Sequence, residues 1–212
     1  MASHDLQEPL RKIQIFTDRL YEAEGGRGDS ISRNYMDKIA SSAGRMQQLT
    51  KDLLNLSVLE KQIDLGPVEV EKSIRMAIDV LDLKMKEKKA TITIGDIPTV
   101  VGNERYLSQL FFNLIGNAIK FSAVAPEVRI TAEKIEDRVR IKIVDNGIGM
   151  SEEGMTKIFE AFQRLNDTSE YEGSGLGLAI CKRIMNIHNG SISVSSELGV
   201  GSTFTINLPA YD

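Results

Sequence analysis

The first part of the chain carries apolar residues at helical spacing. They recur at steps of three and four, which places them on one face of a helix. These residues are Leu6, Leu10, Ile13, Phe16 and Leu20. A glycine-rich break at 25–28 follows, and either Asp29 or Ser30 can cap a second helix.

The second helix is long and follows a heptad pattern. Its apolar seam alternates steps of four and three, as in helices that pair lengthwise. The seam comprises Ile31, Tyr35, Ile39, Ser42, Met46, Leu49, Leu53 and Leu56. The two helices predict a hairpin with an apolar stripe on each arm. Two hairpins pairing into a four-helix bundle would cover both stripes, although packing on the following domain is the alternative.

After Gly66-Pro67 the pattern changes to helices alternating with short strands. We expect helices over 70–85 and 104–121, and a further helix after a glycine loop near 173–177. Strands are predicted at 91–94, 100–101, 128–135, 138–144, 192–196 and 202–208, several of them paired as hairpins. The predicted fold class is therefore α+β: a helical hairpin over 1–64, a four-helix bundle as a dimer, then an α/β sandwich over 65–212. In that sandwich a mixed sheet is covered by helices on one face.

Composition narrows the function classes. The 212 residues are 42% hydrophobic and 26% charged, with a net charge of −4, so we expect a core-forming protein without a nucleic-acid partner. A single cysteine, Cys181, cannot form an internal disulfide, and no stretch approaches the ~20 apolar residues of a membrane span. We expect this portion to be cytoplasmic, with an upstream sensor region that is absent from the sequence.

Alternating glycines stand immediately before a helical apolar run. Gly173, Gly175 and Gly177, with Ser174 and Leu176 between them, precede Leu178-Ala179-Ile180. A helix N-terminus presents free N–H groups and the positive end of the helix dipole, which suit phosphate. A flexible loop without a ligand is the alternative.

The helix over 104–121 carries polar residues on one face. Asn113, Asn117 and Lys120 share that face, opposite Leu110, Leu114, Ile115 and Ile119. The amides either cap neighbouring loops or meet a hydrated Mg²⁺, with Lys120 on phosphate.

Asp145 ends a predicted strand and precedes Gly147 and Gly149. This pattern often marks only a turn. It also suits a carboxylate that accepts from an exocyclic amino group, beside glycines that leave room for a flat base.

Together, these stretches resemble the N, G1, G2 and G3 boxes of the GHKL ATP-binding superfamily. The four boxes are 113–121, 145–150, 173–178 and 199–204, and 159–164 resembles the F box. Their order and spacing are similar to those of two-component sensor histidine kinases, and the residues within the motifs are similar to those of the phytochrome-like subgroup.

The resemblance implies roles for individual residues. Asp145 would bind the adenine amino group, and Gly147 and Gly149 would line the base pocket. Asn117 would bind Mg²⁺ with Asn113 beside it, and Lys120 would contact the phosphates of ATP. The remaining nucleotide-binding residues would be Arg164 in a lid over 164–172, then Gly173, Ser174, Gly175, Leu176, Gly177 and Thr203.

The residues around His4 resemble the H box of the same kinases. The resemblance implies that His4 accepts the γ-phosphoryl group of ATP and passes it to an aspartate on a response-regulator receiver domain, while Asp5 holds or removes the second imidazole proton. Glu8 departs from the Thr or Asn of many relatives, so we expect weak regulator dephosphorylation. The only other histidine, His188, reads as a helix-end residue.

Two alternatives remain open at this point. One is a non-catalytic nucleotide-binding signalling dimer. The other is a GHKL ATPase, which Asn113 disfavours because those enzymes carry a water-activating Glu at this position and an amide cannot act as that base.

Overall fold

The computed structural model describes residues 11, 13–15, 17–18, 36–37, 39–41, 43–44, 46–47, 50, 63–161, 163 and 175–211. The chain divides into two compact units, 1–58 and 59–212. Our boundary at residue 64, with the role that it assigns to each part, stays a prediction. Each unit is considered by itself.

All described residues of the first unit are helical. The two helical segments lie side by side, because a Cβ atom on Gly44 would come within 3.2 Å of Gln14 Nε2. Ala43 is buried, whereas Ile13, Ile39 and Met46 are 45%, 50% and 55% exposed. These exposed residues belong to the predicted apolar stripes, so a single hairpin leaves part of each stripe uncovered.

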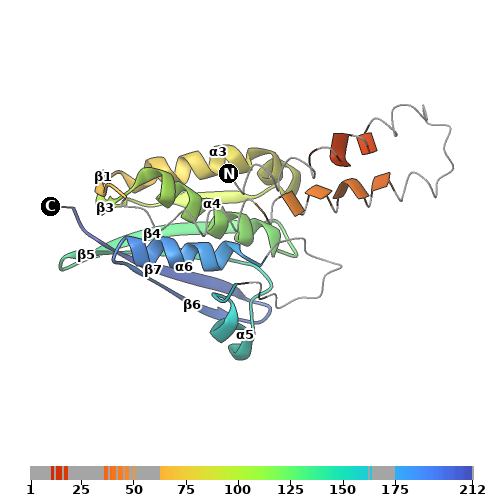
Figure 1. Cartoon of the computed structure of the whole chain (residues 1–212). Helices are drawn as coiled ribbons and strands as arrows, with labels where there is room; N and C mark the ends of the chain where they lie inside the picture. The colour runs from red at the N-terminus through yellow and green to blue at the C-terminus, as the bar shows by residue number, and fades with distance from the viewer. Residues whose placement is uncertain are drawn as a thin grey trace. The chain divides into compact units, whose positions relative to one another are not determined.

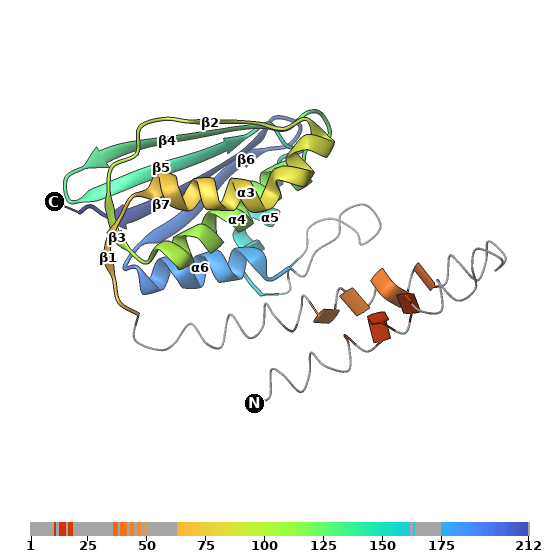
Figure 2. The ribbon, with the colours of Figure 1, turned by 90° about the horizontal axis from the view of Figure 1, so that it is seen from above.

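The second unit is a mixed sheet with helices on one face (Figures 1 and 2), which confirms the predicted fold class. Its elements are β1 (Gly66–Val68), α3 (Val70–Lys88), β2 (Thr91–Ile94), β3 (Val100–Gly102), α4 (Glu104–Lys120), β4 (Glu127–Ile135), β5 (Arg138–Asp145), α5 (Glu152–Lys157), α6 (Gly177–Ile187), β6 (Ser191–Glu197) and β7 (Gly201–Pro209). The five-stranded sheet has the order β2-β4-β5-β7-β6. Only β2 and β4 are parallel; the other pairs are antiparallel.

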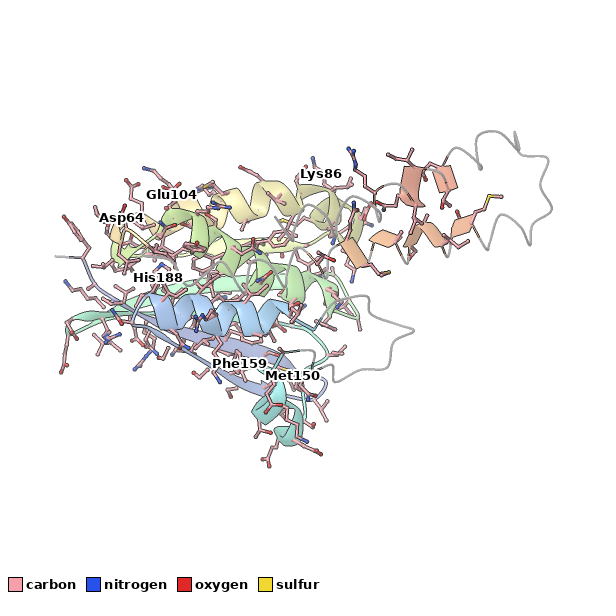
Figure 3. All side chains as sticks on the ribbon, in the orientation of Figure 1. Asp64, Lys86, Glu104, Met150, Phe159 and His188 are labelled. Atoms are coloured by element: carbon pink, nitrogen blue, oxygen red, sulfur yellow. The ribbon has the colours of Figure 1, made fainter. Side chains whose placement is uncertain are left out.

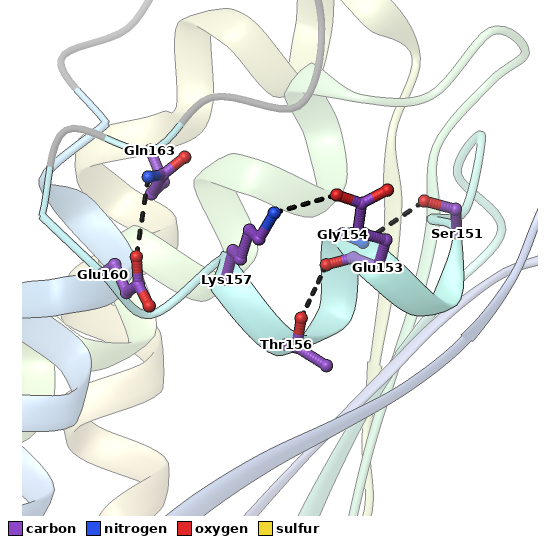
Figure 4. Close-up of polar contacts among 7 residues, drawn as sticks. All are labelled: Ser151, Glu153, Gly154, Thr156, Lys157, Glu160 and Gln163. Carbon is purple, nitrogen blue, oxygen red and sulfur yellow. Dashed lines mark hydrogen bonds and ion pairs between the residues drawn. The ribbon is translucent and has the colours of Figure 1, made fainter.

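Two elements were not predicted. β1 lies where we placed only a boundary, and it pairs with β3 in a separate two-stranded sheet, whose edges tolerate Pro67. The short helix α5 has no long apolar period to mark it. It begins at Ser151, whose hydroxyl accepts from Gly154 N, and Glu153 and Lys157 form an ion pair across one turn (Figure 4).

The core lies between the sheet and the helices. Along β5 the alternating residues Val139, Ile141 and Ile143 are fully buried. Opposite them on β7, Phe204, Ile206 and Leu208 are buried too, in the same register. The other face of these strands carries polar residues, so this alternation fixes which side chains of each strand turn toward the helices.

Helix α4 is held at both ends. The Asn103 side chain accepts from Tyr106 N at 3.3 Å and caps the first turn. At the other end Lys88 Nζ donates to the carbonyl oxygens of Ile119 and Lys120, each at 3.0 Å. These contacts fix the position of the helix that carries the candidate polar face.

His188 joins the end of α6 to the start of α4 (Figure 3). It is fully buried, its Nδ1 lies 2.7 Å from Ile184 O, and its Nε2 lies 3.0 Å from Asn103 N. Because the amide of Asn103 can only donate, Nε2 accepts, Nδ1 carries the proton and the ring is neutral. Burial lowers the pKa of His188 from its ordinary value of 6.5, against a smaller opposite effect of the Ile184 carbonyl.

We therefore expect acid to destabilise the second unit through His188. With a lowered pKa the folded state binds fewer protons than the unfolded state, so stability falls as the pH drops below 6.5. Thermal unfolding of wild type and His188→Gln between pH 8 and 5 measures this, since the amide retains a donor and an acceptor without titrating. Equal pH slopes in the two proteins would contradict the assignment.

Candidate nucleotide site

The site is organised around the carboxylate of Asp145 at the end of β5. Its Oδ1 accepts from the backbone N–H of Gly147 at 2.9 Å and of Ser202 at 3.1 Å. Ser202 is the register partner of Asp145 on β7. No residue in the described ranges donates to Oδ2, so that oxygen remains available to a donor from a ligand.

Burial and hydrogen bonding act in opposite directions on this carboxylate. Burial raises the pKa of Asp145 above its ordinary value of 3.8, and the N–H groups of Gly147 and Ser202 oppose that rise. A carboxylate with one oxygen fixed by backbone donors is well suited to accept from a neutral amino group.

The turn after Asp145 requires glycine at two positions. A Cβ on Gly147 would lie 2.8 Å from Asp145 Oδ1 and 2.9 Å from Phe121 O. Gly149 has a φ of +68°, and a Cβ there would overlap the carbonyl oxygen of Glu197. The turn also bonds to α4, because Ile148 N donates to Phe121 O at 2.9 Å.

The polar face of α4 lies at the same site. Asn113, Asn117 and Lys120 are all half-buried. Lys120 Nζ lies 4.2 Å from the centre of the Phe121 ring, and the carbonyl of Phe121 is the group that holds the Asp145 turn. The structure thus brings residues 113–121 and 145–150 together.

The two asparagines have different partners. Asn113 Nδ2 donates to Gly177 O at 3.2 Å, and its Oδ1 accepts from Gln109 Nε2 at 3.3 Å. Asn117 forms no side-chain hydrogen bond with any other residue that the structure describes. Asn113 therefore connects α4 to the first residue of α6, whereas the amide of Asn117 is the freer of the two to bind a ligand.

The glycine loop opens a helix, as predicted. Gly175 adopts a left-handed φ of +71°, Leu176 is the N-cap, and Gly177 is the first residue of α6. Leu176 is fully buried, so its side chain belongs to the core and only its backbone remains a candidate for phosphate. Gly173, Ser174 and Arg164 lie outside the described residues, as do His4 and Asp5.

The nucleotide-binding role expected of Thr203 stays a prediction, and the register of β7 shows on which face of the sheet it lies. Thr203 pairs with Val144, so it lies on the sheet face opposite Asp145, Phe204 and Ile206. Ser202 lies beside Asp145 instead, and it is 7% exposed. The alternation of buried residues along the strand, at Phe204, Ile206 and Leu208, already indicated that residue 202 and not residue 203 shares their face.

Comparisons with known proteins agree with this geometry. Residues 102–212 match the family described as histidine kinase-, DNA gyrase B- and HSP90-like ATPase, and residues 1–62 match the His Kinase A (phospho-acceptor) domain. The chain belongs to the sensor histidine kinases.

This histidine kinase chain has curated relatives among cyanobacterial phytochromes. It is 40% identical over 99% of its length to "Cyanobacterial phytochrome A" of Nostoc sp. and 35% identical to "Phytochrome-like protein Cph1" of Synechocystis sp.. It spans 28% of the length of each.

Solved structures agree on the fold of the kinase chain. Full-length ShkA in complex with AMPPNP is 30% identical with a TM-score of 0.76, covering 99% of this chain and 44% of that one. Histidine kinase AdeS of Acinetobacter baumannii is 22% identical with a TM-score of 0.69, and the match covers 99% of this chain and 98% of that one.

Among the described helices, none has the length and apolar composition needed to cross a membrane.

Sequence reasoning missed two serines of the site. Ser202 supplies an N–H to Asp145, and Ser196 Oγ accepts from Met150 N at 2.9 Å. β6 carries serine at 191, 193, 195 and 196, so residue type alone could not single out Ser196.

The kinase chain offers a matched glycine pair that tests the Asp145 turn. Gly149 and Gly199 both have left-handed φ, but a Cβ on Gly199 meets nothing within 4 Å. Gly199→Ala should cost only about 1–2 kcal/mol of backbone strain. Gly149→Ala should cost more and abolish ATP binding, because Glu197 must move. Thermal unfolding and calorimetric ATP titration measure both effects; equal losses in the two variants would refute the steric argument.

Proposed function

We propose that the chain catalyses ATP-dependent phosphorylation of His4 and transfers the phosphoryl group to an aspartate of a response-regulator receiver. The observation that carries the proposal is the Asp145 carboxylate, with Oδ1 held by two backbone donors and Oδ2 available to the adenine amino group. The match of residues 1–62 to the phospho-acceptor family supports His4 as the acceptor.

The nucleotide site would use two further features of the described fold. The N-terminus of α6 follows the glycine loop and provides N–H groups for phosphate. Lys120, at the last turn of α4, provides a positive charge on the same helical face as the asparagines. Gly173, Ser174, Gly175, Gly177 and Arg164 are the remaining proposed phosphate and lid residues.

A magnesium ion fits the donors at this site. The described residues contain no cluster of three or more His, Cys, Asp or Glu that could hold a metal ion. Mg²⁺ in phosphoryl-transfer sites is usually held by few protein oxygens together with phosphates and waters, so an amide oxygen is an adequate protein ligand. Asn117 is the first choice, because Asn113 Oδ1 already accepts from Gln109. The ion would neutralise phosphate charge.

The chemistry assigned to this chain is nucleophilic. One nitrogen of His4 forms a bond to the γ-phosphorus, the bond from that phosphorus to the bridging oxygen breaks, and ADP leaves. Asp5 would accept or hold the proton on the other imidazole nitrogen. Positioning and charge neutralisation supply most of the rate acceleration.

The proposed assembly is a homodimer that binds a receiver domain. The exposed stripe residues Ile13, Ile39 and Met46 give the hairpin an apolar surface that a second hairpin can cover. The ATPase alternative finds no support at Asn113, which is an amide already hydrogen-bonded at both ends.

We predict that Asp145→Asn weakens ATP binding without unfolding the protein. The amide oxygen can still accept from Gly147 and Ser202, but its NH₂ then faces the adenine amino group, at a cost of about 1–3 kcal/mol. Asp137→Asn, in the exposed β4–β5 turn, is the matched control. Calorimetric titration should find wild-type affinity only in the control; unchanged affinity in Asp145→Asn would remove the base-binding assignment.

A further prediction concerns His4 as the acceptor of the phosphoryl group. His4→Gln should abolish acid-labile phosphorylation from radiolabelled ATP and leave ATP affinity unchanged, because glutamine lacks a nucleophilic ring nitrogen. Phosphate retained by the variant would identify another acceptor. A mixed dimer of His4→Gln with Asp145→Asn then distinguishes phosphorylation within a subunit from phosphorylation between subunits. Phosphate appears in this dimer only if the subunit that binds ATP modifies its partner.

A further inference from the structure

Three residues form a row across the sheet at the candidate site. Asp145 on β5 pairs with Ser202 on β7, and Ser202 pairs with Ser196 on β6. Partners in register point to the same face, so all three side chains lie on the helix-covered side. Asp145 is the base-recognition residue of the proposed function, whereas no role has yet been assigned to Ser196.

The hydroxyl of Ser196 is fully used. Its Oγ donates to Gly201 O at 2.9 Å, accepts from Met150 N at 2.9 Å, and lies 2.9 Å from Ser202 Oγ. A hydroxyl has a single proton, which goes to Gly201 O, so the proton between the two serines comes from Ser202. Ser196 thus makes one donated and two accepted hydrogen bonds.

These three bonds lead to both N–H groups that hold Asp145. One donor to Asp145 is Ser202 N. Ser196 Oγ accepts a hydrogen bond from the hydroxyl of the same Ser202 and donates to the carbonyl of the preceding residue, Gly201. The other donor, Gly147 N, belongs to the turn whose far end, Met150 N, also bonds to Ser196. The two segments that donate to Asp145 are therefore both hydrogen-bonded to one side chain, that of Ser196.

At the start of this turn the side chain of Asn146 donates to Ala125 O at 3.1 Å and accepts from Glu127 N at 2.9 Å. Two other bonds hold the rest of the turn. Gly199 N donates to Ile148 O at 2.8 Å, and Ile148 N donates to Phe121 O at 2.9 Å. Both are backbone bonds. Among the described residues, Asp145 and Ser196 supply the only side-chain acceptors for the turn from Gly147 to Met150. Removing the Ser196 hydroxyl would release Met150 N, Gly201 O and Ser202 Oγ together.

We propose that Ser196 is a positioning residue for base recognition. Its bonds to Met150 N, Gly201 O and Ser202 Oγ hold the two segments whose N–H groups orient the Asp145 carboxylate, and so it sets how strongly the site distinguishes a purine with a 6-amino group from one without it. The inference rests on the proposed function, because it requires Asp145 to accept from that amino group. Ser196 acts through Asp145 and does not itself touch the base.

The test compares ATP with purine riboside triphosphate, which lacks the 6-amino group, as ligands of the whole chain. Wild type should bind ATP more tightly. Ser196→Ala should lose about two- to tenfold in ATP affinity, the range expected for a disrupted hydrogen bond, and lose little affinity for purine riboside triphosphate. The dissociation constant for purine riboside triphosphate divided by that for ATP should therefore decrease. A general loosening of the domain would weaken both ligands and would leave this ratio unchanged.

Two variants serve as controls. Ser195→Ala changes the neighbouring exposed residue, which pairs with Thr203 on the opposite face, and should keep the wild-type ratio. Ser196→Thr restores a hydroxyl on a residue that strands favour, and should recover the ratio. If Ser196→Ala does not fold, Ser196→Cys substitutes a weaker donor and acceptor of similar size and should shrink the ratio less.

The outcomes separate the two claims. A wild-type ratio near one would show that Asp145 does not recognise the amino group, and the proposed base recognition and this inference would fail together. A wild-type ratio well above one that Ser196→Ala, or Ser196→Cys in its place, leaves unchanged would overturn the role of Ser196 alone. A reduced ratio that Ser196→Thr restores would support it.

Discussion

The structure of the candidate site depends on one constraint: a partly buried carboxylate must be held by donors without losing its capacity to accept from a ligand. Asp145 meets this constraint with two N–H groups on Oδ1, one from its own turn at Gly147 and one from Ser202 on another strand. The second donor exists only when β5 and β7 pair in the observed register. Burial raises the pKa of Asp145 and the two donors oppose that rise, one of them supplied by the pairing of β5 with β7. The close packing of Gly147 and Gly149 against Phe121 and Glu197 follows from the same arrangement.

Much of this site could be predicted from residue order, and what could not be predicted has physical causes. Periodicity located α4 and its polar face, and a carboxylate at a strand end before two glycines located the turn. The motif resemblance singled out Thr203, whereas the alternation of the strand places Ser202 with Phe204 on the helix-covered side. Leu176 stands between two glycines of a candidate phosphate loop, yet it caps α6 as a fully buried core residue. Ser196 could not be found from sequence, because its importance arises from a register across three strands that no local pattern encodes.

The helices position the ligand-facing groups through contacts that lie away from the site. Lys88 on α3 binds the last carbonyls of α4, and Asn113 on α4 binds the first residue of α6. At the far end His188 joins α6 to Asn103, the N-cap of α4. Helix α6 is therefore hydrogen-bonded to the middle of α4 at its first residue and to the N-cap of α4 at its C-cap. This arrangement keeps the polar face of α4 and the N-terminus of α6 in fixed relation, which a phosphate-binding site requires.

The two histidines of the chain illustrate how environment separates chemical roles. His188 is fully buried, its Nδ1–H donates to Ile184 O and its Nε2 accepts from Asn103 N. A nitrogen that already accepts a hydrogen bond inside the core cannot approach a phosphorus atom without breaking that bond and opening the interface of α4 and α6. His188 is thereby excluded as a nucleophile on geometric grounds. The proposed acceptor is therefore His4, which stands in the segment that matches the phospho-acceptor family and in a different compact unit from the candidate nucleotide site. The proposed reaction consequently requires the unit with the candidate nucleotide site and the unit that carries His4 to meet, within one chain or between two.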